Sequence, residues 1–370
     1  MKKKIAIIGA SYLQEPLIQK AKNIGLETHV FAWEVGDPGE TLADYFYPIS
    51  IIEKEQITEI CNNLKIDGIC TIASDLAVKT VNYVANRLGL PGNSLESTQL
   101  STDKVRMREI FNKNSDPSCK SRVVFPEDNP LNKIEATHSW PLIIKPSDRS
   151  GSRGIYLANT ESEIIEGVNA ARQESFNQVV LIEDYVLGDE YSVEYISQNG
   201  KHHFLTATKK LTTGAPHFIE KGHIQPSGLS VQMIEKVKKV VEHALNSLDI
   251  KQGASHTEIK IYKDDITIIE IGARMGGDCI GSHLVPLTTG YDYCRMVIEC
   301  ALNWPISMDI HEHHQSAEVH FIMDDKELLN FKKTLQVENN VTAIPYLRSS
   351  QHEEVKDSST RLGCYIIANN

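Results

Sequence analysis

The sequence predicts an α/β fold whose first part is a parallel sheet covered by helices. Short apolar runs alternate with amphipathic runs up to about residue 95, and Gly25 and Gly89 follow two of these runs, where glycine commonly ends a helix. Uniformly apolar strands are typical of parallel sheets buried on both faces. Strands are expected at residues 4–8, 27–32 and 68–72, and helices at residues 12–24, 57–64 and 75–88. Residues 1–95 form the expected N-terminal α/β domain.

A larger domain is expected at residues 96–305, after the turn-forming segment Pro91-Gly92-Asn93-Ser94. A polar helix should open it, and an antiparallel hairpin should come near its end. The expected helices cover residues 97–112 and 231–248, the strands residues 140–146, 179–183, 190–196, 256–262 and 266–271, and a Gly/Pro-rich loop residues 214–228. Residues 306–370 carry few signals and are expected to form a C-terminal α+β subdomain.

Charge and cysteine content argue against several classes of protein. The 370 residues include 38 lysines and arginines against 49 aspartates and glutamates, and this net charge of −11 argues against a nucleic-acid-binding surface. No apolar run approaches the ~18 residues that span a bilayer, and the run after Lys4 is too short for a signal peptide. Seven cysteines without a Cys-x-x-Cys pair predict reduced thiols. We expect a cytoplasmic protein that binds neither nucleic acid nor membranes, with at most a second copy of itself as a macromolecular partner.

The most specific local feature is the segment from Lys145 to Gly154, Lys-Pro-Ser-Asp-Arg-Ser-Gly-Ser-Arg-Gly. A lysine at the end of a strand, followed by a Ser/Gly loop, suits a polyphosphate, because small residues let backbone N–H groups approach phosphate oxygens. The segment is not a P-loop, since the lysine comes before the glycines. The same composition also fits a flexible hairpin tip without a ligand.

A pair of carboxylates marks a second expected site. Glu258 and Glu270 lie on the two strands of the predicted hairpin, and alternation along each strand brings them to one face. Facing carboxylates repel each other unless a cation lies between them, and Mg²⁺ commonly binds one or two carboxylates together with substrate phosphates. Two solvated carboxylates without a ligand are the alternative. Arg274 follows in a Gly-rich bend, from which a guanidinium can bind a phosphate or a carboxylate.

Taken in order, these segments resemble the ATP-grasp superfamily over residues 1 to about 305. The resemblance implies an ATP-grasp fold, in which a parallel-sheet lobe (the pre-ATP-grasp domain) precedes two α+β lobes that enclose ATP. Lys104 and Lys145 look like its phosphate-contacting lysines, and Ser147, Ser150, Gly151, Ser152 and Gly154 look like parts of its loop over the triphosphate. Glu183, Asp184 and Val186 look like the adenine-binding hinge, Glu190 like the ribose acceptor, and Glu258 and Glu270 like the ligands of Mg²⁺ or Mn²⁺.

One position departs from the superfamily pattern. Many members have Glu-x-Asn-x-Arg, with the asparagine as a third metal ligand, whereas this chain has Glu270-Ile-Gly272-Ala-Arg274, so the number of bound metals is open. The segment from Arg274 to Asp278, together with Glu220-Lys-Gly-His223, resembles the L-amino-acid ligase branch. That likeness implies that Arg274, Gly277 and His223 contact the substrates and the acyl phosphate. Asp278 is expected either to attract a cationic amino group or to cap a helix over residues 279–284.

The implied reaction joins a small-molecule carboxylate, in the first instance an amino acid, to an amine. ATP would convert the carboxylate into an acyl phosphate, with Arg274, His223 and Lys145 as catalytic residues. Residues 147–154 and 214–228 are the expected closing loops, because an exposed acyl phosphate would hydrolyse. Lys145→Ala is expected to weaken nucleotide binding with little effect on the unliganded protein. The alternatives are a bicarbonate- or formate-using ATP-grasp enzyme of a nucleotide or carbamoyl-phosphate pathway, a catalytically silent nucleotide-binding regulator, and a dinucleotide site at Gly9-Ala10-Ser11.

Overall fold

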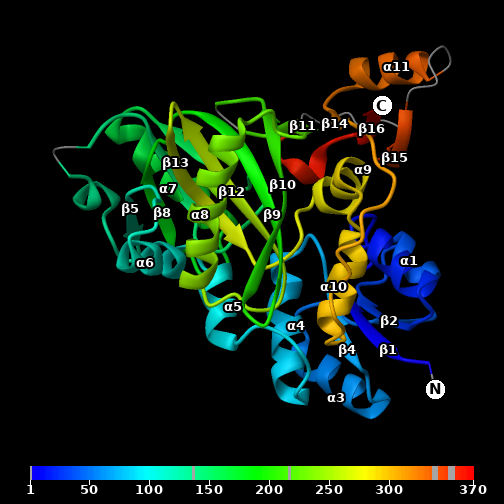
Figure 1. Cartoon of the computed structure of the whole chain (residues 1–370). Coiled ribbons are helices and arrows are strands. Elements are labelled where there is room, and N and C mark those ends of the chain that lie inside the picture. The colour runs from blue at the N-terminus through cyan, green and yellow to red at the C-terminus, as the bar shows by residue number, and fades with distance from the viewer. Residues whose placement is uncertain (1, 136–137, 216–217, 336–340, 349–354) are drawn as a thin grey trace.

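The N-terminal lobe is built on a parallel sheet (Figure 1). The computed structural model describes residues 2–135, 138–215, 218–335, 341–348 and 355–370. The lobe contains β1 (Lys4–Ile8), β2 (Glu27–Ala32), β3 (Tyr45–Pro48), β4 (Gly68–Cys70), α1 (Glu15–Asn23), α2 (Pro38–Leu42), α3 (Lys54–Leu64) and α4 (Asp75–Leu88). The strand order is β3-β2-β1-β4, and apolar cores lie on both faces. The predicted parallel lobe is confirmed, with β3 and α2 as additions.

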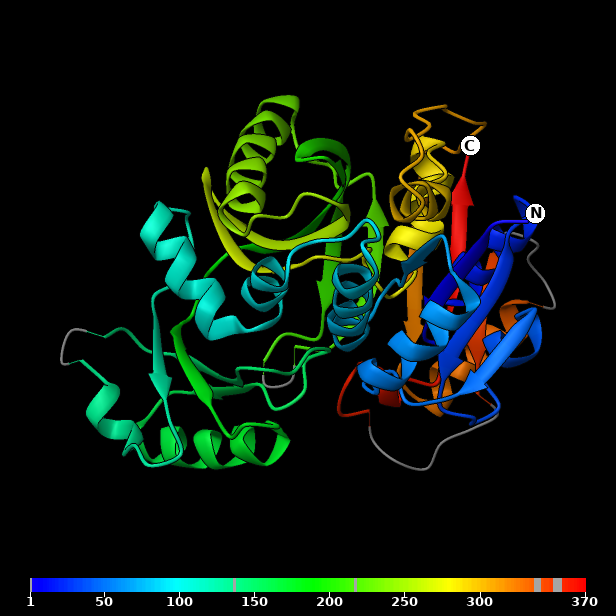
Figure 2. The ribbon, with the colours of Figure 1, turned by 90° about the horizontal axis from the view of Figure 1, so that it is seen from below.

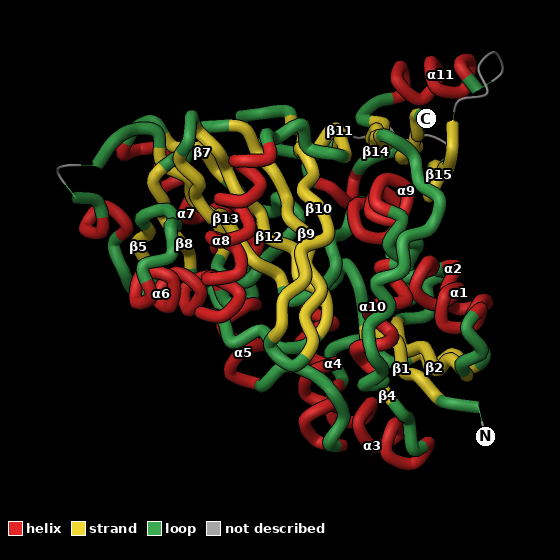
Figure 3. The backbone as a smooth tube through the Cα atoms, in the orientation of Figure 1, coloured by secondary structure: helices red, strands yellow, loops and turns green. Residues whose placement is uncertain are grey.

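The largest sheet is antiparallel and runs through the middle of the molecule. It consists of β9 (Asp189–Gln198), β10 (Lys201–Thr212), β11 (Glu220–Gln225), β12 (Gly253–Tyr262), β13 (Asp265–Gly272), β14 (Ser316–Ile322), β15 (Val341–Leu347) and β16 (Gly363–Asn369). Their order is β13-β12-β9-β10-β11-β14-β16-β15, so the last three strands extend the sheet across residue 305. One face packs against α8 (Val231–Ser247), as Figure 3 shows in red over yellow strands.

A second antiparallel sheet forms a separate small layer. It has the order β5-β8-β6-β7, with β5 (Ser121–Val124), β6 (Leu142–Pro146), β7 (Tyr156–Ala158) and β8 (Val180–Asp184), and it packs against α7 (Glu161–Glu174). The single helix expected at residues 97–112 is instead two helices, α5 (Leu95–Thr102) and α6 (Lys104–Asn114). The break has a local cause: the carboxylate of Asp103 accepts hydrogen bonds from the N–H groups of Val105 and Arg106 and so starts a new helix.

The N-terminal lobe and the large sheet share one apolar core. Helix α10 (Tyr293–Ala301) packs against α1 and β4 on one side and against β9 and β12 on the other. Figure 2 shows the resulting arrangement from below, with the N-terminal lobe beside the C-terminal strand. The remaining helical segments are α9 (Val285–Thr289), α11 (Asp325–Thr334), a π-helical turn (Ile280–Leu284) and two 3₁₀ turns (Pro130–Lys133 and Ser358–Thr360). Because α10 packs against both parts, the carboxyl ends of β1 and β4 lie next to the large sheet.

One expected loop is partly a strand. Residues 214–228 are rich in glycine and proline, but residues 220–225 form β11, which pairs with β10 and β14. Sheet pairing on both sides overrides the local composition there. His223 therefore lies on a strand and not in a loop. None of the described helices has the length and apolar character needed to cross a bilayer.

Candidate active site

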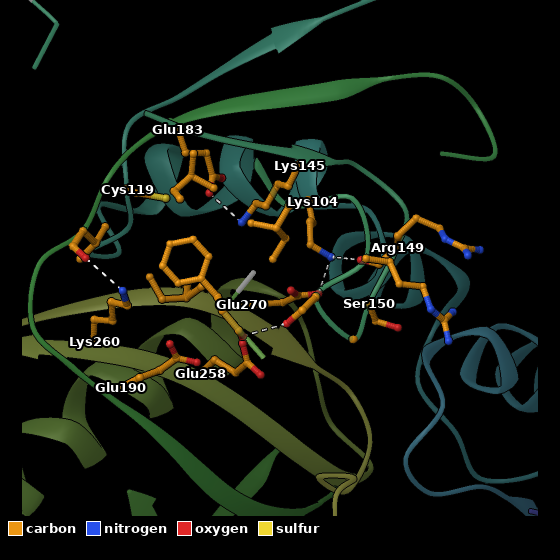
Figure 4. Close-up of a pocket in the computed structure, with 18 of the residues that line it drawn as sticks. Lys104, Cys119, Lys145, Arg149, Ser150, Glu183, Glu190, Glu258, Lys260 and Glu270 are labelled. Atoms are coloured by element: carbon orange, nitrogen blue, oxygen red, sulfur yellow. Dashed lines mark hydrogen bonds and ion pairs between the residues drawn. The ribbon is translucent and has the colours of Figure 1, made fainter. Parts of the chain in front are cut away.

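A cavity lies between the small sheet and the face of the large sheet opposite α8 (Figure 4). Apolar residues of β9, β12 and β13 pack against α8, so the residues that alternate with them, including Glu190 and Glu258, face the cavity. Ile143, Ile155 and Ile269 add apolar surface. Of the residues expected to bind nucleotide or metal, the cavity is lined by Lys104, Lys145, Ser150, Gly151, Ser152, Glu183, Asp184, Val186, Glu190, Glu258 and Glu270.

Glu183 holds two cations at the end of β8. Its carboxylate accepts a hydrogen bond from Arg108 Nε at 2.8 Å and pairs with Lys145 Nζ at 2.6 Å, and all three side chains are buried. Burial raises the pKa of Glu183, but Arg108 and Lys145 outweigh it and lower the pKa to about 2. This ion pair argues against the expectation that Lys145→Ala has little effect on the unliganded protein, because the variant would leave a buried carboxylate one partner short.

Lys104 connects the expected metal site to the Ser/Gly loop. It is the first residue of α6, and its ammonium donates hydrogen bonds to Glu270 Oε1 and to the backbone oxygen of Arg149, both at 2.7 Å (Figure 4). Burial lowers the pKa of Lys104, but the facing Glu270 carboxylate outweighs this and raises it. The ammonium is therefore charged at neutral pH.

Glu258 and Glu270 are direct neighbours in the register of β12 and β13, so their carboxylates lie on one face. Burial raises the pKa of Glu258, but Lys210 and His256 hold it well below its ordinary value. Ionised carboxylate oxygens are the donors that Mg²⁺ and Mn²⁺ take, so the pair fits such an ion. The described residues contain no group of three or more histidine, cysteine or acidic side chains arranged for a metal, so bound phosphates or water would have to complete the coordination.

Lys210 is a cavity residue that the sequence analysis missed. Its buried ammonium lies 2.9 Å from Glu190 Oε1, 2.8 Å from Glu258 Oε1 and 3.5 Å from Glu220 Oε1. The signal was present in the sequence, because two adjacent lysines on a strand point to opposite faces. Lys209 points outward to Asp189, and Lys210 points into the cavity.

His256 connects the buried Glu194 to Glu258, one of the two paired carboxylates. His256 Nδ1 is hydrogen-bonded to the buried Glu194, and its Nε2 lies 3.6 Å from Glu258 Oε1. Glu194 also accepts a hydrogen bond from the backbone N–H of Gly276 at 3.0 Å. Burial lowers the pKa of His256, but Glu194 and Glu258 outweigh it and raise the pKa to about 9.

The end of β8 and the segment that follows it line the cavity with Asp184, Tyr185 and Val186. Asp184 pairs with Arg122 Nη1 at 2.7 Å, and the backbone oxygen of Val186 accepts a hydrogen bond from Lys260 Nζ at 3.2 Å. The Lys260 ammonium lies 4.9 Å from the centroid of the Tyr185 ring. An aromatic ring with a cation over it suits a heterocyclic base more than a phosphate.

Two of the five small residues expected to face phosphates lie outside the cavity. Ser147 is buried, and its hydroxyl donates a hydrogen bond to Asn177 Oδ1 at 3.2 Å. Gly154 has a φ of +68°, and a Cβ there would lie 2.9 Å from Pro146 Cγ, so both backbone and space require glycine. Ser150, Gly151 and Ser152 do line the cavity, and Ser152 Oγ donates to the backbone oxygen of Phe218 at 3.2 Å. That contact joins the two expected closing loops.

A second cavity, of about 440 Å³, adjoins the first, and Ser150, Lys210, Glu258 and Arg274 line both. It lies at the carboxyl ends of β1 and β4, the usual place for a ligand on a parallel sheet. The N-terminal lobe and the C-terminal segment contribute Tyr12, Asp75, Tyr346, Ser358 and Arg361, all missed in the sequence. All four residues expected to contact substrate line it: His223, Arg274, Gly277 and Asp278.

His223 is buried at the wall of the second cavity. Among the described residues neither of its ring nitrogens has a hydrogen-bond partner, and its ring lies edge-on to Phe321 with centroids 5.4 Å apart. Burial lowers its pKa to about 3, with a smaller opposing effect of Asp278. The imidazole is therefore neutral at physiological pH, with one nitrogen to donate and one to accept.

Asp278 is held by a residue from the C-terminal segment. Its carboxylate accepts a hydrogen bond from Arg361 Nη2 at 2.5 Å, and the Arg361 guanidinium stacks 3.7 Å from the centroid of Phe321. The helical turn that follows begins after Cys279 and has no side-chain cap, so the alternative of Asp278 as a helix cap is wrong. The paired carboxylate and guanidinium give this cavity charges of both signs.

Comparisons with known proteins agree with this arrangement. Residues 138–282 match the family model of the ATP-grasp domain. The alanine–anticapsin ligase of Bacillus subtilis (strain 168) is 26% identical over 273 residues, covering 64% of this chain and 57% of that protein, so the chain matches little more than half of that relative's length. The L-amino acid ligase structure from Bacillus licheniformis has a TM-score of 0.82 at 22% identity and covers 100% of this chain and 93% of its own. The N5-carboxyaminoimidazole synthetase of Staphylococcus aureus complexed with ADP has a TM-score of 0.80 at 17% identity, covering 100% and 94%. The fold predicted from the sequence is confirmed.

Proposed function

Because the chain contains an ATP-grasp domain, we propose that it is an ATP-dependent ligase that joins the carboxylate of one amino acid to the amine of another. The observation that carries the proposal is the junction of the two cavities. The first cavity is lined by lysines and paired carboxylates, the second holds charges of both signs, and Arg274 and Glu258 line both. A carboxylate bound at the junction would lie between the phosphate-binding end of the first cavity and the amine-binding space of the second.

In the first step a carboxylate oxygen of the substrate attacks the γ-phosphorus of ATP and ADP leaves, which gives an acyl phosphate. Lys104 and Lys145 would hold the phosphates, and Arg274 would balance the charge that develops on the transferred phosphoryl oxygens. Mg²⁺ bound at Glu258 and Glu270 would supply further charge neutralisation. The loop from Ser150 to Ser152 and its contact at Phe218 would keep water from the junction.

In the second step the amine nitrogen attacks the acyl carbon, the C–O bond to phosphate breaks, and the departing phosphate takes up the proton that the amine loses. The neutral imidazole of His223 is suited to accept a hydrogen bond from that amine, since its ring nitrogens have no other partner within the described residues. Arg274, Arg361 and Asp278 would complement the charged ends of amino acids. No protein nucleophile is required, because the activated group is on the substrate.

A ligase that uses bicarbonate or formate is the second candidate. The likeness in fold to the N5-carboxyaminoimidazole synthetase structure is the observation that favours this candidate. The two candidates differ in what must enter the second cavity. A neutral buried imidazole next to an aspartate–arginine pair supports a zwitterionic ligand there.

A substrate panel tests the proposal. Purified protein with ATP and Mg²⁺ is offered pairs of amino acids, or bicarbonate or formate with amines, and phosphate release and product mass are both recorded. The proposal expects phosphate release only with an amino-acid pair, together with a condensed product. Phosphate release driven by bicarbonate or formate, with no amide from any amino-acid pair, would move the assignment to the second candidate. A protein that binds nucleotide but turns over none of these would be a regulator.

A further inference from the structure

Gly272, the position that departs from the superfamily pattern, has its side-chain space filled from the other lobe. A Cβ at residue 272 would lie 3.0 Å from Asp75 Oδ1 and 3.2 Å from the Cζ and Nε atoms of Arg274. Gly272 is the last residue of β13, and its φ is outside the left-handed region, so the backbone there would accept other residues. A Cβ at these distances would require the Asp75–Arg274 pair to move by a few tenths of an ångström, so space, and not backbone geometry, disfavours a larger residue at this position.

The group that occupies this space is an ion pair between the two lobes. Arg274 donates from Nε to Asp75 Oδ1 at 2.9 Å and from Nη2 to Asp75 Oδ2 at 3.1 Å. This two-point geometry fixes the plane of the guanidinium as well as its position. Both side chains are largely shielded from water, with 15% of Arg274 and 20% of Asp75 exposed.

Asp75 is itself held firmly. It is the first residue of α4, and Ser74 caps that helix by accepting the N–H of Ala77. One residue earlier, the N–H of Ala73 donates to the backbone oxygen of Met275 at 3.2 Å. The loop after β4 therefore contacts the loop after β13 directly, which keeps the Asp75 carboxylate within reach of the Arg274 guanidinium.

We propose that Asp75 is a positioning residue, which holds Arg274 at the junction of the two cavities, and that Gly272 is glycine in order to admit this pair. In the wider superfamily pattern an asparagine occupies the position of Gly272; here the same space is filled by Arg274 and by the Asp75 carboxylate that the N-terminal lobe supplies. The inference rests on the proposed function for what Arg274 contacts, which is the carboxylate being activated. Asp75 acts on that group only through Arg274.

Three variants and one control test the inference. Asp75→Asn removes the charge at nearly constant volume, Gly272→Ala places a methyl group against the Asp75–Arg274 pair, and the double variant combines them. Lys20→Gln is the control, because Lys20 forms another ion pair between the lobes, 2.7 Å from Asp292 and away from both cavities. Each protein is assayed for the Michaelis constants of both substrates, for kcat, for ADP affinity without metal, and for its unliganded unfolding midpoint.

Asp75→Asn and Gly272→Ala are each expected to raise KM for the carboxylate substrate about tenfold or to lower kcat by a similar factor, since small displacements of a clamping group have effects of this size. ADP affinity without metal should stay within twofold of wild type, as should every constant of Lys20→Gln. The double variant should be no worse than the poorer single variant, because both changes break one ion pair.

Two results would overturn the inference. Wild-type KM and kcat in Asp75→Asn would show that Arg274 does not need Asp75. Additive effects on the unfolding midpoints of the unliganded single and double variants would show that Asp75 and Gly272 do not act through one contact, whatever reaction the enzyme catalyses. Failure of the wild-type protein to form any amide would instead overturn the proposed function. The comparison of unfolding midpoints among wild type, the two single variants and the double variant would then decide by itself whether Asp75 and Gly272 act through one contact.

Discussion

Replacing Glu183 with glutamine should destabilise the unliganded protein by about 3 kcal/mol at pH 7. Despite burial, Arg108 and Lys145 lower the pKa of this carboxyl from 4.5 to about 2, and each pKa unit corresponds to about 1.4 kcal/mol. The variant would also leave two buried cations without a counter-charge. Glu96→Gln is the control, because Glu96 is 69% exposed and lies 3.6 Å from Arg106 at the surface, where an ion pair is worth less than about 1 kcal/mol.

The pH dependence gives this prediction a sign. A carboxyl whose pKa is lower in the folded protein stabilises it fully above pH 4.5, and that contribution is lost as the pH falls from 4.5 toward 2. The difference between wild type and Glu183→Gln in urea unfolding, followed by tryptophan fluorescence, should therefore shrink between pH 7 and pH 3. A difference below about 0.5 kcal/mol at pH 7, or one that does not change with pH, would refute the reasoning.

Three further predictions concern the two cavities. Glu270→Gln should lower ATP turnover at least about 100-fold, because it removes an expected metal ligand; near-wild-type turnover at saturating Mg²⁺ would contradict this. Lys210→Met leaves three carboxylates without their shared cation, so Mg²⁺ alone should raise the melting temperature of the variant more than that of wild type; equal shifts would contradict the role of Lys210. His223→Leu should form amide at least about tenfold more slowly, with unchanged ADP affinity. Its free energy of unfolding should also fall less steeply than that of wild type as the pH drops from 6.5 toward 3. In that range His223 of wild type binds a proton in the unfolded chain but not in the folded protein, and the variant lacks this group. Unchanged amide formation would exclude a substrate contact.

The sequence predicted the parts of the fold that depend on short-range patterns. Alternation in β12 and β13 placed Glu258 opposite Glu270, and the structure has that register. Composition misled where long-range pairing decides the structure: residues 220–225 look like loop but are a strand between β10 and β14. The continuous helix expected near residue 104 failed because one side chain, Asp103, starts a new helix.

Residues that enter a site from a distant segment of the chain could not be predicted from the sequence. Arg361 bonds Asp278 across 83 residues of sequence, and Asp75 bonds Arg274 across 199. Neither stands in a recognisable motif, and only packing brings the N-terminal lobe and the C-terminal strands to the second cavity. Lys210 is different, because the strand alternation of Lys209 and Lys210 carried a usable signal.

The central claim is that a carboxylate is activated by transfer of a phosphoryl group and then captured by an amine. Its most direct test uses a carboxylate substrate, found in the amino-acid panel, labelled with ¹⁸O in the carboxyl group. The account predicts one ¹⁸O atom in the inorganic phosphate for each amide formed, because the carboxylate oxygen that attacks phosphorus leaves with it. Phosphate that carries no label, with ADP as the nucleotide product, would contradict it.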